Sequence, residues 1–342
     1  MMALERSVLN EDSIRTILRT EYGLHLIGQK KLSLGSANCY KVLCEEGDFF
    51  LKEYQSEFKT DKVDREAKLV SYLSDKGFPV ASFIKPLHAA NAMVYDGHVI
   101  SVQVFVEGRT YLNDLPHATL MKGAGYLGKL HTLLMDYPME TEMDYRWASG
   151  ISSEAVARKF DALFDALNED ETDPNRERIR EDLNFKKELI RHMDGWKEYF
   201  KDVTFAATHG DYTACQFICD GEDIKAIIDF SSAGTLPAVW EIMRSYIQSG
   251  GVSRAGTSLD IDDFVSYVRE YRKYAPLTKQ DLEAMPYLYL FQLTQSSYGY
   301  KEYLITKTEN RDALLDFAFW RTGICREIYG RAAEISEALM KC

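Results

Sequence analysis

The stretch that most constrains this chain runs from His209 to Phe230, HGDYTACQFICDGEDIKAIIDF. Two short apolar runs flank the turn residues DGED, which is the pattern of a strand, a tight turn and a second strand. A hairpin of this kind would hold Asp211 and Asp229 at one end, with Gln216 between them in sequence. Two carboxylates and an amide oxygen could bind a hard cation such as Mg²⁺ and orient a hydroxyl nucleophile.

A structural interpretation of the same residues is also open. An aspartate beside a hairpin is commonly a turn residue or a strand-end cap, and a short motif has a real false-positive risk. The deciding observation is whether the other parts of a phosphoryl-transfer site occur elsewhere in the chain in the correct order.

Composition limits the classes of function. The length of 342 residues suggests about two domains, and 46% hydrophobic with 27% charged residues is ordinary for a soluble globular protein. The net charge of −12 argues against a nucleic-acid partner, because a surface that follows phosphates needs positive charge. An acidic surface is compatible with a cationic substrate, although solubility alone explains it equally well.

The cysteines and the apolar runs point to a cytoplasmic protein. The six cysteines are scattered without paired spacing, which favours free thiols in a reducing compartment over a zinc site or a disulfide scaffold. The N-terminal residues are charged and lack an apolar signal core, and no apolar run approaches the ~20 residues of a membrane span. We therefore expect neither a membrane nor a nucleic acid as a partner.

The first third of the chain has the pattern of a small β-rich lobe. A helix is expected at 10–21, and a second helix at 59–73 is inserted among about five short antiparallel strands. The expected strands are 30–34, 39–44, 49–54, 92–95 and 99–106.

Lys52 and Glu66 are the charged residues of interest in this lobe. Period-2 alternation puts Lys52 between Phe50 and Tyr54 on one strand face, so that it is either buried there or points to water from an edge strand. Glu66 lies at the border of the apolar stripe of the helix, where it either reaches a buried lysine or belongs to a solvated face.

The character of the chain changes near 104–108. We expect a domain of residues 1–106, a hinge at about 104–108, and a helical domain of residues 107–342. Glycines at 123, 125 and 128 indicate close helix packing. The helices are expected at 120–135, 153–167, 176–200, 238–248, 262–274, 279–304 and 312–341.

The parts of a nucleotide kinase site occur in this chain in kinase order. Such an enzyme needs a loop over the phosphates, a phosphate-binding lysine, an acid that fixes the lysine, a hydroxyl-orienting aspartate and metal ligands. One glycine in the loop is a weak signal, but the ordered set is much stronger, because several independent coincidences must hold. The candidates are Gly35, Ser36 and Asn38 in the loop, then Lys52, Glu66, Asp211, Gln216 and Asp229.

On these motifs the sequence resembles the aminoglycoside phosphotransferase and choline kinase-like family, over roughly residues 32–245. The resemblance implies an α+β, protein-kinase-like fold with two lobes, a small antiparallel N-terminal lobe for the nucleotide and a larger helical C-terminal lobe. It also implies ATP and Mg²⁺ as cofactors, with GTP left open as the donor. We then expect Lys52 to bind phosphates and pair with Glu66, and Val104–Val106 to offer backbone groups to the adenine.

The same resemblance makes Asp211 the catalytic residue and Asp229 a metal ligand. Gln216 stands where the family usually has Asn, so the amide oxygen is kept but moved by one methylene. Glu241 is interpreted as structural, with Arg244 as its candidate partner.

The leading hypothesis is an ATP-dependent phosphotransferase acting on a hydroxyl of a small molecule, such as an aminoglycoside or another amino-bearing compound. Choline, homoserine and sugars are alternative acceptors, and a pseudokinase without turnover is an alternative function. A protein kinase is disfavoured because only residues 230–240 separate Asp229 from Glu241, with no long activation loop. The acidic loop at 169–173 fits a cationic acceptor or a solvated linker, and the chain is expected to be a monomer or a homodimer.

Overall fold

The computed structural model describes residues 5–32, 37–139 and 150–342. The chain forms two compact units, each assembled from separate segments. The first unit contains Met1–Thr110 and Gln216–Ala233, and the second contains Tyr111–Cys215 and Gly234–Cys342. The sequence-based division at residues 106 and 107 remains a prediction.

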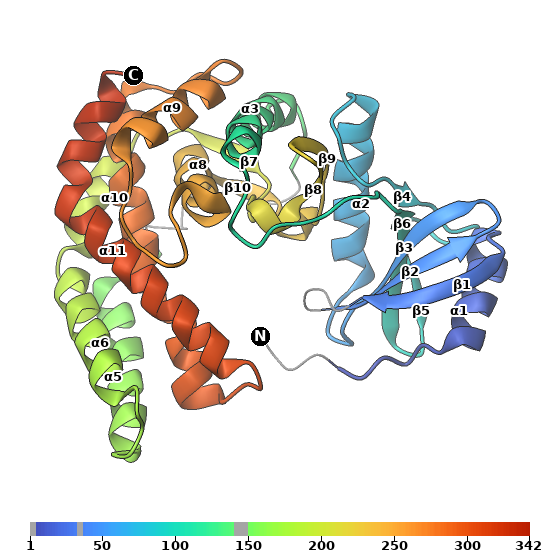
Figure 1. The fold of residues 1–342 in the computed structure, drawn as a ribbon, viewed down its shortest axis with the longest axis horizontal. Helices are drawn as coiled ribbons and strands as arrows, with labels where there is room; N and C mark the ends of the chain where they lie inside the picture. The colour runs from blue at the N-terminus through green and yellow to red at the C-terminus, as the bar shows by residue number, and fades with distance from the viewer. Residues whose placement is uncertain (1–4, 33–36, 140–149) are drawn as a thin grey trace. The chain divides into compact units, whose positions relative to one another are not determined.

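An antiparallel sheet of six strands forms the centre of the first unit (Figure 1). Its order is β1-β2-β3-β6-β4, and β5 pairs with β6. Five strands were expected; β4 has only two residues, which is too short for an alternating pattern to be recognised. The strands are β1 (Leu26–Leu32), β2 (Asn38–Cys44), β3 (Gly47–Glu53), β4 (Phe83–Ile84), β5 (Met93–Tyr95) and β6 (His98–Val104).

Helix α1 (Glu11–Ile17) begins at Asn10, whose side chain accepts a hydrogen bond from the Ser13 amide while the Ser13 hydroxyl accepts one from the Asn10 amide. This reciprocal capping fixes the first turn. The helix continues through a π turn (Leu18–Tyr22). Its apolar residues join Val42, Leu51 and Ile100 of the sheet in one buried cluster, so α1 covers one face of the sheet.

Helix α2 (Thr60–Asp75) begins after β3, and Val63 near its start packs in a second cluster with Tyr54 and Val99. Strand β3 pairs with β2 on one side and with β6 on the other. Lys52 therefore lies on an internal strand, and the edge-strand alternative is wrong.

The hairpin predicted in the opening stretch is present, as β8 (Phe217–Asp220) and β9 (Asp223–Ile227). Short 3-10 turns precede it (Ala214–Gln216) and follow it (Phe230–Ser232). The hairpin belongs to the first unit, where the Ile227 amide donates to the Pro79 carbonyl over 2.9 Å.

The second unit is mainly helical, with a two-stranded sheet of β7 (Phe205–Thr208) and β10 (Gly234–Pro237). That sheet was not expected, since β7 is short and rich in alanine and β10 contains Gly and Pro. The expected helix at 176–200 is divided into α6 (Arg176–Ile190), α7 (Met193–Trp196) and a 3-10 turn (Lys197–Phe200). The expected helix at 279–304 is shorter, because α10 ends at Gln295 and a separate π turn (Glu302–Thr306) follows it. The helices are α3 (His117–Leu134), α5 (Ser153–Glu169), α6 (Arg176–Ile190), α7 (Met193–Trp196), α8 (Ala238–Tyr246) with a π turn (Ile247–Gly251), α9 (Ile261–Arg272), α10 (Lys279–Gln295) and α11 (Arg311–Met340).

Close helix packing at the glycines of α3 is confirmed. A Cβ on Gly128 would lie 2.5 Å from the carbonyl oxygen of Tyr271 on α9. Helices α10 and α11 lie side by side (Figure 1). Tyr289 of α10 and Tyr300, which lies between the two helices in sequence, are both buried. The predicted α+β class is thus confirmed.

Two further observations concern the whole chain. All six cysteines are free thiols. Within the residues that the structure describes, every helix is too short or too polar to cross a membrane.

Candidate functional site

Lys52 and Asp229 come together in the first unit. The Lys52 ammonium on β3 lies 3.6 Å from Asp229 Oδ1, and only 17% of the lysine side chain is exposed. Asp229 follows β9 in the left-handed conformation, with φ 62° and ψ 63°, and the Ser231 hydroxyl donates to its Oδ1 over 2.7 Å. The hairpin thus brings a carboxylate to the lysine of the neighbouring sheet.

Glu66 of α2 is buried close to this pair. Burial raises the pKa of Glu66 to about 7, against the opposing effects of Lys52 and of the Phe230 amide that donates to it. Burial also lowers the pKa of Lys52, but Tyr54, Asp229 and Glu66 outweigh it, so the pKa is raised. Among the described residues, the ion pair of Lys52 is with Asp229, and Glu66 contributes an electrostatic attraction to the same ammonium.

Tyr54, the residue directly after β3, supports Lys52. The Lys52 ammonium lies 4.8 Å from the centroid of the Tyr54 ring, within the range of a cation–π interaction. Sequence reasoning noted the aromatic neighbours of Lys52 but gave Tyr54 no role. Its position two residues after the lysine was the available signal.

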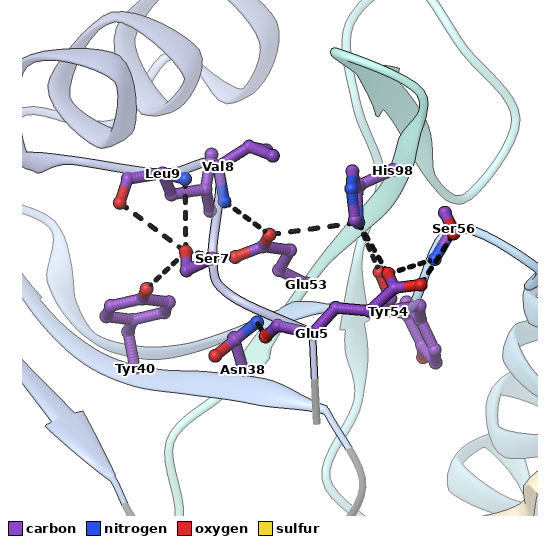
Figure 2. A network of polar contacts seen from close by, with 10 residues as sticks. All are labelled: Glu5, Ser7, Val8, Leu9, Asn38, Tyr40, Glu53, Tyr54, Ser56 and His98. Atoms are coloured by element: carbon purple, nitrogen blue, oxygen red, sulfur yellow. Dashed lines mark hydrogen bonds and ion pairs between the residues drawn. The ribbon is translucent and has the colours of Figure 1, made fainter. Parts of the chain in front are cut away.

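Asn38 is the one loop candidate that the structure describes, since Gly35 and Ser36 lie outside the described residues. Its amide nitrogen donates to the Glu5 carbonyl over 3.1 Å. Figure 2 shows the N-terminal segment at this end of the sheet, where the Ser7 hydroxyl and the Val8 amide bind the buried Glu53 carboxylate. The side chains of Asn38 and Glu53 therefore bind the N-terminal segment.

The two hinge candidates differ in what their backbones can offer. The Val104 amide donates to the Ser82 carbonyl over 2.9 Å, so it is already used in the sheet. The Val106 backbone makes no hydrogen bond within the described residues, which suits a residue that recognises a ligand through its backbone.

Gln216 ends the turn that directly precedes the hairpin and is 9% exposed. Its carbonyl accepts a hydrogen bond from the Ile228 amide over 3.0 Å, which places its backbone beside the residue that precedes Asp229. Gln216 and Asp229 therefore come from adjacent ends of the hairpin.

Asp211 lies in the second unit and forms an ion pair with Arg244 of α8. Its amide donates to Nδ1 of the buried His209 over 3.2 Å, which fixes the loop backbone. The Asp211 carboxylate remains 36% exposed beside the guanidinium. This is a held carboxylate that a ligand can reach.

Glu241 organises the backbone before Asp211. Its buried carboxylate accepts hydrogen bonds from the amides of His209 (3.1 Å) and Gly210 (2.6 Å) and from His131 Nε2 (2.9 Å). Burial raises the pKa of Glu241, but these donors and the nearby histidines outweigh it, and the net shift is downward.

The structural role predicted for Glu241 agrees with these contacts, but its predicted partner was wrong. The Glu241 carboxylate is taken up by His131 and by the amides of His209 and Gly210, and Arg244 pairs instead with Asp211 of the preceding loop. Sequence reasoning also missed His131, for which the sequence holds no signal; its Nδ1 contacts the Tyr271 hydroxyl over 2.8 Å.

Comparison with known families gives a match over residues 29–277 to the phosphotransferase enzyme family. The chain belongs to this family. The phosphotransferase assignment makes it an enzyme, a small-molecule kinase, as the resemblance implied. Comparison with curated proteins finds no match.

Solved structures of other phosphotransferases share the fold. A spectinomycin phosphotransferase in complex with ADP and spectinomycin is 14% identical, with a TM-score of 0.67 over 97% of this chain and 100% of that one. An amicoumacin kinase in complex with AMP-PNP, Ca²⁺ and Ami is 13% identical, with a TM-score of 0.66 over 93% of this chain and 94% of that one. An aminoglycoside 2'-phosphotransferase with GDP is 14% identical, with a TM-score of 0.58 over 93% and 99%. The predicted protein-kinase-like fold is thus confirmed.

Proposed function

We propose that this phosphotransferase moves the γ-phosphoryl group of ATP to a hydroxyl of a small molecule. The observation that carries the proposal is the Lys52–Asp229 ion pair, which joins a lysine of the sheet to a carboxylate of the hairpin. Two neighbours of similar fold bind ADP and AMP-PNP, and a third binds GDP, so ATP is the first donor to test and GTP the second.

In this proposal the first unit binds the nucleotide. Lys52 would hold the phosphates, with Tyr54 beneath its ammonium and Glu66 behind it. The backbone of Val106 would meet the adenine. Preorganised charge of this kind stabilises a transferring phosphoryl group without reorganisation during the reaction.

Asp229 and Gln216 would hold Mg²⁺. The donor types fit, because carboxylate and amide oxygens are the hard ligands that this cation prefers, and 39% of the Asp229 side chain is exposed. When bound, the cation would neutralise charge on the phosphates. Asp229 would exchange its ion pair with Lys52 for that role, which frees the ammonium for phosphate.

Asp211 would orient the acceptor hydroxyl and take its proton late in the transfer. A loose transition state requires little prior deprotonation, so positioning matters more than basicity. Arg244, together with the hydrogen bond from the Asp211 amide to the His209 ring, would keep the carboxylate in place before the acceptor binds.

The test is the Asp211→Ala variant, assayed for both nucleotide binding and turnover. We expect turnover to fall by roughly 10²–10⁴-fold, the usual contribution of a positioned acid–base group, while the Kd for Mg-ATP stays unchanged. Asp220→Ala is the matched control, because Asp220 is an exposed aspartate of the same stretch. Retained turnover in Asp211→Ala would reject Asp211 as the catalytic residue.

The pseudokinase alternative is separated by the wild-type chain. If it binds Mg-ATP but transfers no phosphoryl group to any acceptor, the chain is a binding module. The acceptor itself and the choice between monomer and homodimer stay predictions; a cationic acceptor was inferred only from net charge and the acidic loop.

A further inference from the structure

Arg254 and Arg321 of the second unit have no carboxylate partner within the described residues. Arg254 is exposed and lies over two rings, 4.7 Å from the Phe317 centroid and 4.5 Å from that of Trp320. Arg321 of α11 is only 8% exposed and lies 5.5 Å from the centroid of the same Phe317 ring. Two guanidinium groups therefore flank one aromatic side chain.

The charge of Arg321 is poorly compensated inside the protein. Its Nη1 donates to the Ser296 hydroxyl over 3.1 Å, but its buried Nε has no hydrogen-bond partner within the described residues. Burial lowers its pKa, and the repulsion of Arg244 acts in the same direction. A buried charge left in this state is costly, and such groups are normally paired.

The end of α10 does not supply the missing negative charge. The carbonyls there could offset a cation through the helix dipole, which amounts to about half a charge. They are already used by other cations, since Lys186 donates to the carbonyls of Leu293 (3.0 Å) and Ser296 (2.9 Å) and Lys159 donates to that of Gln295. The carbonyls at this helix end therefore do not compensate the charge of Arg321.

These arginines lie in the surroundings of Asp211. Arg321 is close enough to Arg244, the partner of Asp211, for the two cations to repel each other. Arg254 interacts electrostatically with Cys215, which in turn interacts with Asp211 and Arg244. Both arginines thus act electrostatically on residues that in turn act on Asp211, the carboxylate that would orient the acceptor.

We propose that the acceptor carries an anionic group, a carboxylate or a phosphate, and that Arg254 and Arg321 bind it while its hydroxyl meets Asp211. A guanidinium recognises both groups through paired hydrogen bonds, and the exposed Arg254 gives access from solvent. This inference rests on the proposed function and names its acceptor class. It differs from the expectation of a cationic acceptor because local charge, not the net charge of −12, decides what binds at a site.

The test uses matched pairs of hydroxyl compounds that differ in charge. The pairs are gluconate and sorbitol, glycerate and glycerol, and glucose 6-phosphate and glucose, with kanamycin as a polycation. Each is measured with the full chain in two ways, as the shift in Tm with Mg²⁺ and a non-hydrolysable ATP analogue, and as phosphoryl transfer from Mg-ATP. We expect a shift with the anionic member of at least one pair and none with its neutral partner. Gluconate against glucose 6-phosphate separates a carboxylate from a phosphate.

Two variants and one control connect the response to the arginines. Arg254→Met and Arg321→Met should each weaken the binding of the anion at least tenfold. Arg178→Met is the control, because Arg178 also stacks on a ring of α11, 3.8 Å from the Phe319 centroid, and should keep the wild-type response. Arg254 is exposed, so its variant does not depend on whether a core change at Arg321 is tolerated.

Arg321→Met has a second readout that a purely structural arginine would not give. Removing an uncompensated buried charge should raise the Tm of the free protein while anion binding is lost. A lower Tm in the free protein, with anion binding retained, contradicts the proposal.

The remaining outcomes separate this inference from the proposed function. The anionic acceptor is rejected if none of the anionic compounds shifts the Tm. It is also rejected if neutral or cationic compounds bind as well as their anionic partners. If phosphoryl transfer occurs to those neutral or cationic compounds, the proposed phosphotransferase function is supported and only the anionic acceptor class is rejected. If Mg-ATP itself does not bind, the proposed function fails first.

Discussion

Asp211 and Arg244 form an ion pair between residues that are 33 positions apart in sequence. The arginine is mostly buried, and its guanidinium also lies 5.5 Å from the centroid of the Trp240 ring. A cation held on one side by an aromatic ring gives the carboxylate a fixed partner. The direction in which Asp211 meets a hydroxyl is thus set by α8.

Arg244→Met should lower kcat by roughly 10²-fold, because a carboxylate displaced by about 1 Å loses the positioning that accelerates transfer. The Kd for Mg-ATP should not change, since the nucleotide is proposed to bind in the other unit. Steady-state kinetics beside nucleotide titration checks this, with the exposed Arg269→Met of α9 as the control. A kcat equal to that of wild type would show that Asp211 needs no support from Arg244.

Glu66 makes the stability of the free protein depend on pH. Its pKa of about 7 lies above the ordinary value of 4.5, so the folded chain holds a proton that the unfolded chain has lost between these values. The stabilising contribution is therefore fully present below pH 4.5 and is lost as the pH rises to about 7. The loss is on the order of 3–4 kcal/mol, because one pKa unit corresponds to about 1.4 kcal/mol.

The Glu66→Gln variant removes this titration. We expect its free energy of unfolding to fall less between pH 5 and pH 7.5 than that of wild type, in urea titrations without nucleotide. Parallel curves for the two proteins would mean that Glu66 titrates as it does in water.

At the scale of elements, Gly108 connects β6 to the hairpin. The Arg109 amide and the Cys219 carbonyl form a hydrogen bond of 2.9 Å, and Gly108 passes beside this contact with φ +157°. A Cβ at Gly108 would lie 2.6 Å from Ile218 Cγ2 and 2.7 Å from the Cys219 oxygen. Only a residue without a side chain fits there unless the backbone moves.

Gly108→Ala should therefore destabilise the chain by roughly 1–3 kcal/mol, the usual range for overpacking a tight contact. The decrease in Tm should be larger than that of Gly221→Ala, where a Cβ would meet open space and only the positive φ of 58° opposes the change. Thermal denaturation of the two variants makes the comparison. Equal decreases would show that the contact with β8 relaxes at little cost.

The elements that sequence predicts well are those with a local signal. The β8–β9 hairpin was predicted because turn residues stand between two apolar runs, and Lys52 and Asp229 were chosen because the order of motifs is local information. The partner of Arg244 could not be predicted, since spacing within α8 shows which residues share a helical face but not which distant loop meets that face. His131 and Arg321 depend in the same way on tertiary contacts.

At the scale of the whole molecule, the two units are interleaved along the chain. The first unit needs Gln216–Ala233 to complete it, and the second continues on both sides of that segment. Lys52, proposed to hold the phosphates, and Asp229, proposed to hold Mg²⁺, thus come from the two parts of the first unit.

Hydrogen exchange can test this division. Mg-ATP should slow exchange in residues 38–66 and 216–233 together, although they are far apart in sequence, because binding raises the free energy of local opening in both. The helices α5 and α6 should exchange as before. Protection limited to the N-terminal segment alone would contradict a nucleotide site shared with the hairpin.

The interleaving also sets an order for biosynthesis. A ribosome releases the sheet of β1 to β6 long before it has made β8 and β9, and domains usually begin to fold as their residues emerge. Until residue 233 has left the exit tunnel, the Pro79 carbonyl and the Arg109 amide lack the strands with which they pair in the finished protein. A nascent chain shorter than this cannot present Asp229 to Lys52, so the capacity to hold a nucleotide should arise late and abruptly during translation.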